Sequence, residues 1–445
     1  MIPESFKNRM REMLGDEYDE FIAALEKNEA VRSLRANKLK CSAQHFEEIC
    51  NFKVDPIEHI AFAYRFYEDK IGGNALHHAG AFYVQDPSAM LPVAAAKRII
   101  WPGMRVLDMC AAPGGKTTQL ASLLLGEGCL VSNEKVTSRA RILQGNIERM
   151  GIKNAVVTNC SPDIIAKNYK KYFDFVLCDA PCSGEGMFRK YDNAADEWSE
   201  ENVLLCAERQ KEILHYAAKT VAGGGYLMYS TCTFSKEENE DVISEFLEDH
   251  SSFEMVPIDE DVKAVTTEGI GMPEARRFYP HKADGEGQFL CLLRKKEGEK
   301  YDISFEDNLK KMKKEDKTVC EEFLMDTLGF VPDHIRFLRE NAVLSNDLAA
   351  PDGTFSCGVT LGEVTKGRLV PHHHFFSAYG AEMLRRVELT LEDPRVAAYL
   401  KGEGIAADIE NGWCAITVEG IAVGGGKAVN GYVKNHYPKG LRLRD

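Results

Sequence analysis

Arg105-Val-Leu-Asp-Met-Cys-Ala-Ala-Pro-Gly-Gly-Lys116 is the stretch of sequence that decides the fold of this chain. Residues 105–109 form an apolar run typical of a buried strand, and a glycine turn separates that run from a helical stretch that begins at Lys116. A glycine turn at a helix N-terminus allows a ligand to approach the backbone closely. The stretch therefore predicts an α/β unit that binds a ligand at the carboxyl edge of its sheet.

Strand-like and helical stretches alternate on both sides of this turn, which predicts an α/β fold with a parallel, doubly wound, Rossmann-like sheet. The pattern of Ser235 and Glu238 is that of a capping box, and it predicts a helix that runs to about Asp249. The strand-like runs are residues 105–109, 129–133, 155–159, 173–178, 225–230, 253–257 and 288–294, and the helical stretches are residues 116–125, 137–150 and 200–221.

The chain of 445 residues is too long for one hydrophobic core, and its length predicts roughly three domains. We expect an N-terminal helical and small α/β module over residues 1–95 and the main α/β domain over residues 96–296. A lysine- and acid-rich linker is expected over residues 297–320, and a smaller, mixed and partly β domain over residues 321–445.

The two flanking domains show weaker patterns than the main one. Residues 1–30 carry apolar side chains spaced for one helix face, and Ser42 is placed to cap a helix over residues 42–49. In the C-terminal domain, residues 364–376 and 413–423 look like strands with glycine-rich turns. The apolar face of residues 1–30 is formed by Phe6, Met10, Leu14, Tyr18 and Phe21.

The composition is typical of a folded soluble protein, with 44% hydrophobic and 28% charged residues. No run approaches the roughly 18 apolar residues of a membrane span, and the first residues lack the apolar core of a signal peptide. We therefore expect a cytoplasmic protein without membrane contact. The 13 cysteines are scattered and form no Cys-x-x-Cys motif, which favours reduced thiols over disulfides.

The net charge of -14 argues against binding nucleic acid through bulk charge, but two basic clusters stand out locally. Either cluster can be a solvated face or a contact for phosphates. The first cluster consists of Arg32, Arg35, Lys38 and Lys40, and the second of Lys427, Lys434, Lys439, Arg442 and Arg444.

Two cysteines follow strand-like runs at the expected carboxyl edge of the sheet. Cys182 lies in Asp179-Ala-Pro-Cys-Ser-Gly184, and Cys232 lies in Tyr229-Ser-Thr-Cys-Thr-Phe-Ser235. Either one alone could be an ordinary buried thiol, whereas two at neighbouring strand ends favour a catalytic pair. The helix expected after Ser235 would lower the pKa of the Cys232 thiol, although position alone does not say which cysteine attacks.

The turn at Asp108 to Lys116 restricts the class of ligand. It lacks the glycine pattern of a P-loop and the Gly-x-Gly-x-x-Gly dinucleotide fingerprint, which disfavours ATP and NAD. Glu134 follows the second strand-like run at the position where an acidic side chain binds ribose hydroxyls in such folds. A glycine turn can be only a turn and Glu134 only a charge at a helix start, but their spacing favours a nucleoside ligand.

Several long motifs resemble the Sun/Nop family of S-adenosylmethionine-dependent RNA 5-methylcytosine methyltransferases. They are Asp108 to Lys116, Asp179-Ala-Pro-Cys-Ser-Gly-Glu-Gly-Met-Phe-Arg-Lys190 and Ser230-Thr-Cys-Thr-Phe-Ser-Lys-Glu-Glu-Asn-Glu240, with Gln85-Asp-Pro-Ser-Ala-Met90 before them. The tail Val433-Lys-Asn-His-Tyr-Pro-Lys-Gly440 is similar to that of the RsmF/YebU branch, which acts on small-subunit ribosomal RNA. The resemblance implies a Rossmann-like methyltransferase domain between two RNA-binding flanks, the last with a PUA-like end.

The resemblance also implies roles for the residues at the sheet edge. Cys232 would attack carbon 6 of cytosine, and Asp179 would bind the ring and help to protonate it. Cys182 would assist removal of the carbon 5 proton and release of the enzyme, and Lys190 would contact the base or its phosphate. DNA cytosine methyltransferases instead use the cysteine of a Pro-Cys motif as nucleophile, a precedent that favours Cys182 and that the family motif overrides.

The resemblance further implies that S-adenosylmethionine binds at the glycine turn. The chain departs from many family members in Thr158-Asn-Cys-Ser-Pro162, where they carry an aspartate that contacts adenine; Asp163 is the nearest acid here, so this contact stays open. The expected cofactor residues are Cys110, Ala111, Ala112, Pro113, Gly114, Gly115, Lys116, Glu134, Arg139 and Asp179.

The expected partner is RNA, as 16S ribosomal RNA or the small ribosomal subunit, and we expect a monomer without a metal ion. The alternatives are a transfer RNA cytosine-5 methyltransferase and a ribosome-assembly factor whose methylation is incidental. A nitrogen-directed methyltransferase is disfavoured because Asp179-Ala-Pro-Cys182 replaces the usual Asp/Asn-Pro-Pro-aromatic turn. His372-His-His374 would alternate between the faces of a strand, which favours a surface or RNA-contact role over a metal site.

Overall fold

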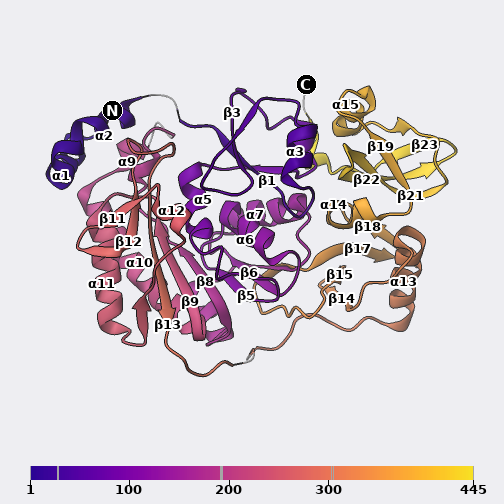
Figure 1. The fold of residues 1–445 in the computed structure, drawn as a ribbon. Coiled ribbons are helices and arrows are strands. Elements are labelled where there is room, and N and C mark those ends of the chain that lie inside the picture. Colours follow the sequence, from indigo (N-terminus) through magenta and orange to yellow (C-terminus); the bar gives the residue numbers. More distant parts are fainter. Residues whose placement is uncertain (1, 28–29, 191–193, 302, 304, 444–445) are drawn as a thin grey trace.

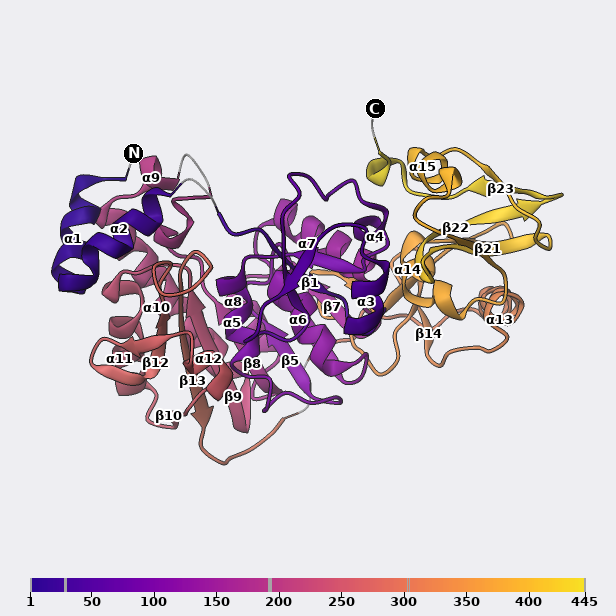
Figure 2. The same ribbon diagram turned by 45° about the horizontal axis from the view of Figure 1, so that its top comes forward.

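The computed structural model describes residues 2–27, 30–190, 194–301, 303 and 305–443. The main α/β domain lies in the middle of the elongated molecule, with the first two helices at one end and the C-terminal domain at the other (Figures 1 and 2). Within the described residues, no helix is long and apolar enough to cross a membrane.

A ten-stranded sheet forms the centre of the main domain, in the order β11-β12-β13-β9-β8-β5-β6-β7-β16, with β10 paired to β13. The five strands that follow one another in the sheet as β9-β8-β5-β6-β7 run parallel, which confirms the predicted doubly wound, Rossmann-like sheet. These parallel strands are β5 (Arg105–Asp108), β6 (Cys129–Asn133), β7 (Ala155–Thr158), β8 (Phe173–Asp179) and β9 (Val221–Thr231). The antiparallel strands at one edge are β10 (Phe253–Met255), β11 (Thr267–Gly269), β12 (Met272–Phe278) and β13 (Gln288–Lys295).

Helices cover both faces of this sheet because the strand side chains alternate between two apolar cores. Val106 packs in the core under α5, α6 and α7, and Leu107 packs in the core under α8, α10 and α11. These helices are α5 (Pro87–Ala94), α6 (Gly115–Leu124), α7 (Thr137–Met150), α8 (Pro162–Asn168), α10 (Glu200–Thr220) and α11 (Glu240–Asp249).

A strand from the C-terminal region completes the main sheet. β16 (Thr354–Cys357) pairs antiparallel with β7, and the Asn159 amide donates to the Gly353 carbonyl over 2.9 Å. The helix α13 (Lys314–Leu328) begins inside the stretch expected to be a linker. The pattern of residues 321–445 gave no indication that one of its strands joins the main domain, because strand pairing at this sequence separation has no local signal.

The N-terminal module consists of two parts. The described part of residues 1–30 is helical, as expected, and contains α1 (Glu4–Leu14) and α2 (Tyr18–Glu26). The two helices pack on the main domain through Phe6 against Trp198 and Phe21 against Phe234. The second part is a sheet in the order β2-β3-β1-β4 with two helices. Its elements are β1 (Ser33–Ala36), α3 (Ala43–Ile49), β2 (Val54–Pro56), β3 (Ala63–Phe66), α4 (Ala75–His78) and β4 (Phe82–Val84).

The local prediction at Ser42 is confirmed. In the first basic cluster Arg32 and Lys38 are exposed, whereas Arg35 and Lys40 are not free at the surface. The Ser42 hydroxyl accepts from the His45 amide over 3.1 Å and caps α3. Arg35 is only 2% exposed and donates to the Gly115 carbonyl over 3.1 Å and to Thr118 over 2.6 Å. The Lys40 ammonium donates to two backbone carbonyls, those of Ala79 and Arg149. The expectation of a phosphate-binding cluster is therefore wrong for Arg35 and Lys40, which hold the module against α6 and α7.

The C-terminal domain contains two small sheets. The first has the order β14-β15-β17-β18, and the second has the order β19-β21-β22-β23-β20. The strands of the first are β14 (Ile335–Leu338), β15 (Asn341–Leu344), β17 (Val359–Thr365) and β18 (Arg368–Pro371), followed by α14 (His373–Tyr379). The second contains β19 (Arg386–Leu389), α15 (Pro394–Lys401), β20 (Ile405–Ala406), β21 (Gly412–Val418), β22 (Ile421–Val429) and β23 (Tyr432–Asn435).

The predicted strand over residues 364–376 is wrong, because a hairpin ends at Pro371 and α14 follows. The surface role expected for the three histidines is also wrong for two of them. His374 is fully buried; its Nδ1 accepts from the Thr360 amide over 3.3 Å and its Nε2 lies 3.1 Å from the Ile152 carbonyl. His373 is buried as well, and burial lowers the pKa of both imidazoles to about 3. Both histidines are therefore neutral; His374 packs α14 against the main domain, and the ring of His373 packs against Tyr437 of the C-terminal domain.

Candidate active site

A cavity of about 370 Å³ opens at the carboxyl ends of β5, β8 and β9, where the sequence places the two catalytic candidates. It brings together most of the predicted site residues, while Gly114, Glu134 and Cys182 lie outside its lining. The predicted residues that line it are Cys110, Ala111, Ala112, Pro113, Gly115, Lys116, Arg139, Asp179, Lys190 and Cys232.

The glycine turn forms one wall of this cavity. Gly114 adopts φ of +116°, a left-handed conformation that favours glycine, and α6 begins at the next residue. The Ala111 amide donates to the Asn133 carbonyl over 2.8 Å, and the Arg139 guanidinium donates to the Ala112 carbonyl over 2.8 Å. The turn is therefore held from the ends of β6 and α7, and it presents its backbone to the cavity.

Glu134 directly follows β6 and is buried next to this turn. One of its carboxylate oxygens accepts from the Val136 amide over 2.8 Å, and the other lies 3.6 Å from Arg139 Nε. At the end of β7, the Asn159 side chain donates to the Glu134 carbonyl over 2.7 Å, whereas Asp163 is exposed in the first turn of α8. The end of β7 thus supplies an amide beside Glu134.

Lys116 and Asp179 form an ion pair on the floor of the cavity. Lys116 Nζ lies 2.8 Å from one Asp179 oxygen, and the Ser230 hydroxyl donates to the other over 2.7 Å. Burial opposes the charge of Lys116, but the attraction of Asp179 outweighs it and raises the pKa of Lys116. The sequence assigned Lys116 only to the cofactor, and the ion pair with Asp179 is a contact that spacing could not indicate.

The two cysteines are in direct contact. Cys182 Sγ lies 3.2 Å from Cys232 Sγ, and only Cys232 lines the cavity. The contact with Cys232, together with burial, raises the pKa of Cys182 well above its ordinary value, so that Cys182 is held as a neutral thiol. The two cysteines therefore differ: Cys232 lines the cavity, whereas Cys182 lies beside it as a protonated thiol.

The capping box predicted at Ser235 is wrong. A short 3₁₀ turn follows at Lys236–Glu238, and α11 begins only at Glu240. The Ser235 hydroxyl donates to the Glu185 carboxylate over 2.6 Å instead of capping a helix. The helix N-terminus expected directly behind Cys232 therefore lies further along, at Glu240, and the nearby cation is Lys116, whose own pKa is raised by Asp179 and also by Cys232.

Several residues of the cavity had no predicted role. Asp86 caps α5 by accepting from the Ser88 amide over 2.9 Å, and this turn belongs to the Gln85–Met90 motif of the sequence. That motif could have indicated the lining residues that it contains, whereas Met187 reaches the site from a short 3₁₀ helix and Gln288 from the start of β13, both without a local signal. The additional lining residues are Tyr83, Val84, Gln85, Asp86, Ser88, Ala89, Asp108, Ala180, Met187, Gly287 and Gln288.

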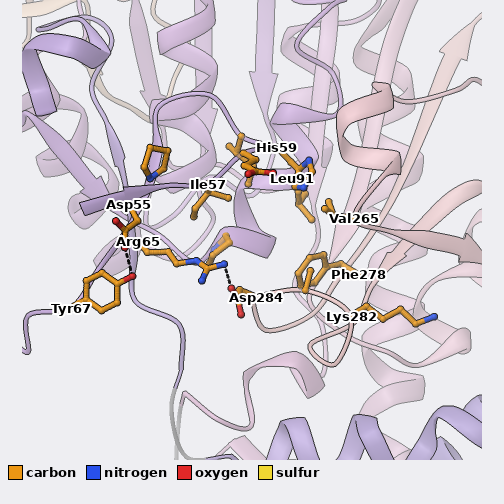
Figure 3. Close-up of a pocket in the computed structure, with 15 residues that line it drawn as sticks. Asp55, Ile57, His59, Arg65, Tyr67, Leu91, Val265, Phe278, Lys282 and Asp284 are labelled. Atoms are coloured by element: carbon orange, nitrogen blue, oxygen red, sulfur yellow. Dashed lines mark hydrogen bonds and ion pairs between the residues drawn. The ribbon is translucent and has the colours of Figure 1, made fainter. Parts of the chain in front are cut away.

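A larger cavity of about 620 Å³ lies elsewhere, between the N-terminal module and the main domain (Figure 3). Asp55, Arg65 and Tyr67 of the module face Phe278 and Lys282 of the main domain across it. Arg65 forms an ion pair with Asp284 across the cavity. None of the predicted site residues lines this larger cavity.

Comparison with known proteins agrees with the motifs. Residues 101–294 match the model of the 16S rRNA methyltransferase RsmB/F family. Over 481 aligned residues the chain is 32% identical to the ribosomal RNA small subunit methyltransferase F of Vibrio campbellii, covering 100% of this chain and 98% of that protein. The chain belongs to the RsmB/F family. The family predicted from the sequence is thereby confirmed, and the chain is a methyltransferase.

Further matches cover the flanks and the fold. Residues 2–87 match the N-terminal domain of 16S rRNA methyltransferase RsmF, and residues 386–443 match the methyltransferase RsmF PUA domain. The ribosomal RNA small subunit methyltransferase F of Salmonella agona is 37% identical over 308 residues, which cover 66% of this chain and 63% of that protein. A crystal structure of a methyltransferase homolog protein from Pyrococcus horikoshii superposes with a TM-score of 0.56 at 27% identity, covering 66% of this chain and 95% of that one.

Proposed function

We propose that this methyltransferase transfers a methyl group from S-adenosylmethionine to carbon 5 of cytosines in 16S ribosomal RNA through a covalent cysteine–cytosine intermediate. The observation that carries the proposal is the separation of 3.2 Å between Cys182 Sγ and Cys232 Sγ beside the Asp179 carboxylate. A single thiol would suffice for attack, whereas a second thiol in contact with it supplies a group for the release step. The relatives named as ribosomal RNA small subunit methyltransferases support the choice of RNA.

The residues beside Cys232 suit S-adenosylmethionine, which supplies the methyl group when bound. Residues 110–113, 115 and 116 line the cavity, and a nucleoside can approach the backbone closely at Gly115, which carries no side chain. Glu134 keeps one oxygen free of backbone bonds and would accept from ribose hydroxyls, with Arg139 holding that carboxylate in place. These groups would bind and orient S-adenosylmethionine, and they leave Cys232 and Asp179 free to contact the cytosine.

In the mechanism that we propose, the Cys232 thiolate adds to carbon 6 of cytosine, forming a sulfur–carbon bond and making carbon 5 electron-rich. Lys116, which is charged and close to Cys232, stabilises the thiolate. Asp179 is held by Lys116 and Ser230 so that it can bind the polar edge of the ring and pass to the ring the proton that the Cys232 thiol gives up. Carbon 5 then takes the methyl group.

The release step needs a base and a leaving group. Once the sulfur of Cys232 is bonded to carbon 6 it carries no charge, which removes the largest influence that keeps Cys182 protonated. After methyl transfer, Cys182, having given its own proton to solvent, takes the carbon 5 proton, and the bond between Cys232 and carbon 6 breaks so that the Cys232 thiolate leaves and the ring is restored. Lys190 is exposed at the cavity and would contact the base or its phosphate. A paired base cannot reach Cys232, so the target must be unpaired or flipped out of its stack.

Methyl transfer to defined RNAs tests the proposal. With methyl-labelled S-adenosylmethionine, 16S ribosomal RNA or isolated small subunits are expected to become labelled, and nucleoside analysis should recover the label as 5-methylcytidine. Transfer RNA is the control substrate. Label in a nitrogen-methylated cytidine would overturn the carbon 5 assignment, and label in transfer RNA alone would favour the alternative substrate. A Cys232 variant that rescues an assembly defect of a deletion strain would favour an assembly factor whose methylation is incidental.

The exposed face of β22 and β23 supports RNA binding by the C-terminal domain, which resembles a PUA domain. Lys427 lies directly opposite Lys434 in the two strands, and Lys439 is exposed shortly after them. Of the remaining basic residues in the tail, Arg442 donates to the Tyr437 carbonyl, and Arg444 lies outside the described residues. Two like charges opposite one another are unfavourable unless a polyanion lies across them.

Reversing the charges of Lys434 and Lys439 is therefore expected to weaken RNA binding. Each lost phosphate contact should reduce the slope of log affinity against log salt by roughly one, so that the double substitution to glutamate flattens it by about two. The measurement is RNA affinity over a series of salt concentrations. The matched control is Lys170→Glu with Lys219→Glu, two exposed residues in the turn after α8 and in the last turn of α10. An unchanged slope in the Lys434 and Lys439 variant would count against this surface.

A further inference from the structure

The two loops that carry the thiols exchange buried carboxylates. Glu185 follows Cys182 by three residues, and Glu238 follows Cys232 by six residues. Both side chains are buried, with Glu185 1% exposed and Glu238 0% exposed. Each carboxylate accepts hydrogen bonds from the loop of the other cysteine rather than from its own. We call Glu185 and Glu238 the carboxylate pair.

Glu185 holds the backbone that follows Cys232. It accepts from the Phe234 amide over 2.8 Å, from the Thr233 hydroxyl over 2.9 Å and from the Ser235 hydroxyl over 2.6 Å. The Trp198 indole adds a fourth donor over 2.9 Å. One carboxylate oxygen accepts from the Trp198 N–H and the other from the Phe234 N–H, so the amide group of a glutamine would point its own N–H donors at one of these two donors.

Glu238 holds the backbone that follows Cys182. It accepts from the Ser183 amide over 2.9 Å and also from the Ser183 hydroxyl. The Gln210 side chain donates to it over 2.7 Å and also to the Pro181 carbonyl over 3.0 Å, so both neighbours of Cys182 are fixed. Burial raises the pKa of the Glu238 carboxyl, and the hydrogen bonds from Ser183 and Gln210 oppose that shift.

A backbone contact sets the spacing between the two loops. The Gly186 amide donates to the Cys232 carbonyl over 2.8 Å, and a side chain at Gly186 would meet that same oxygen. The carboxylate pair and this contact all act within a few residues of the thiols. The separation between the thiols therefore depends on both carboxylates, each acting on a different cysteine.

We propose that the carboxylate pair consists of positioning residues with separate tasks, in which Glu185 places the Cys232 thiol for attack and Glu238 places the Cys182 thiol for release. This inference rests on the proposed function, since it assigns the pair to the two steps of that reaction. A general structural role would slow both steps together. Separate tasks instead predict that the two glutamine variants fail at different steps.

The test compares Glu185→Gln with Glu238→Gln in the full chain, with RNA and S-adenosylmethionine present. For Glu238→Gln we expect a covalent RNA adduct to accumulate, with methyl transfer in the first turnover and steady-state turnover reduced at least tenfold. For Glu185→Gln we expect the first turnover itself to slow at least tenfold, with little adduct. Denaturing gels measure the adduct, and rapid-mix single-turnover assays measure methyl transfer.

Controls separate positioning from unfolding. Glu245→Gln removes an exposed carboxylate of α11 that pairs with Lys211, and it should leave both steps unchanged. Ser183→Ala and Ser235→Ala each remove one donor to the pair while leaving both carboxylates in place. Ser183→Ala should accumulate adduct, as Glu238→Gln does, and Ser235→Ala should form little adduct, as Glu185→Gln does. These two variants keep the test decisive if a glutamine variant does not fold.

Two outcomes would overturn the inference, and they differ from failure of the proposed function. If Cys182→Ala traps an adduct but Glu238→Gln and Ser183→Ala do not, the proposed reaction stands and the positioning role of Glu238 is wrong. If the variants at both glutamates reduce both steps in the same proportion, the pair is only structural. If Cys182→Ala itself traps no adduct, the proposed release step is wrong.

Discussion

Replacing Cys232 with alanine is expected to abolish methyl transfer and to leave no covalent RNA adduct. Among the described cysteines, only Cys232 and Cys110 of the glycine turn line the cavity, and Cys232 lies near the Lys116 ammonium. Loss of a nucleophile in covalent catalysis typically costs at least roughly 10³-fold in rate. The rate of methyl transfer and the RNA adduct on denaturing gels are the two measurements.

Cys182→Ala should have the opposite effect on the adduct. Attack by Cys232 remains possible, but the thiol held 3.2 Å from it is gone, so the covalent complex should accumulate while turnover is lost. Cys50→Ala, in the N-terminal module, controls for loss of a partly exposed thiol that is remote from the cavity. An adduct formed by the Cys232 variant and not by the Cys182 variant would exchange the two roles.

The main sheet was predictable because its signals are local. Each parallel strand is a short apolar run bounded by a turn, and the predicted runs over residues 129–133 and 173–178 match β6 and β8 to within one residue. Once these strands are parallel, their carboxyl ends must meet at one edge, so Cys182 and Cys232 had to lie close together. Contacts between distant segments had no such signal, and the pairing of β16 with β7 is the clearest case.

The errors at the site have a common physical cause, which is competition from tertiary partners. A serine followed three residues later by a glutamate is a capping box only if their side chains bind their own helix. Here Glu185 accepts from Ser235, and Glu238 turns to Ser183, so both side chains bind elsewhere. The same competition explains Arg35, whose charge suggested a surface but whose donors are used by backbone and side-chain acceptors around α6.

Asp179→Asn is expected to lower kcat by roughly 10²- to 10⁴-fold, the usual effect of removing a group that transfers a proton in the reaction. Asparagine is nearly the same size and can still accept from Ser230, so the shape of the cavity should be kept. It cannot supply a proton to the ring, and it leaves the Lys116 charge without its partner at 2.8 Å. Because the charge near the base changes more than the cavity shape, kcat should fall further than the affinity for RNA.

The measurement is kcat and KM for RNA, together with the amount of adduct, in Asp179→Asn and in a surface control. Asp249→Asn replaces an exposed carboxylate at the end of α11 and should behave like the native chain. If Asp179 assists attack by Cys232, its variant must also form less adduct than Cys182→Ala does. Retention of kcat within about threefold would mean that ring protonation does not limit the reaction, and Asp179 would then serve only to hold Lys116 beside Cys232.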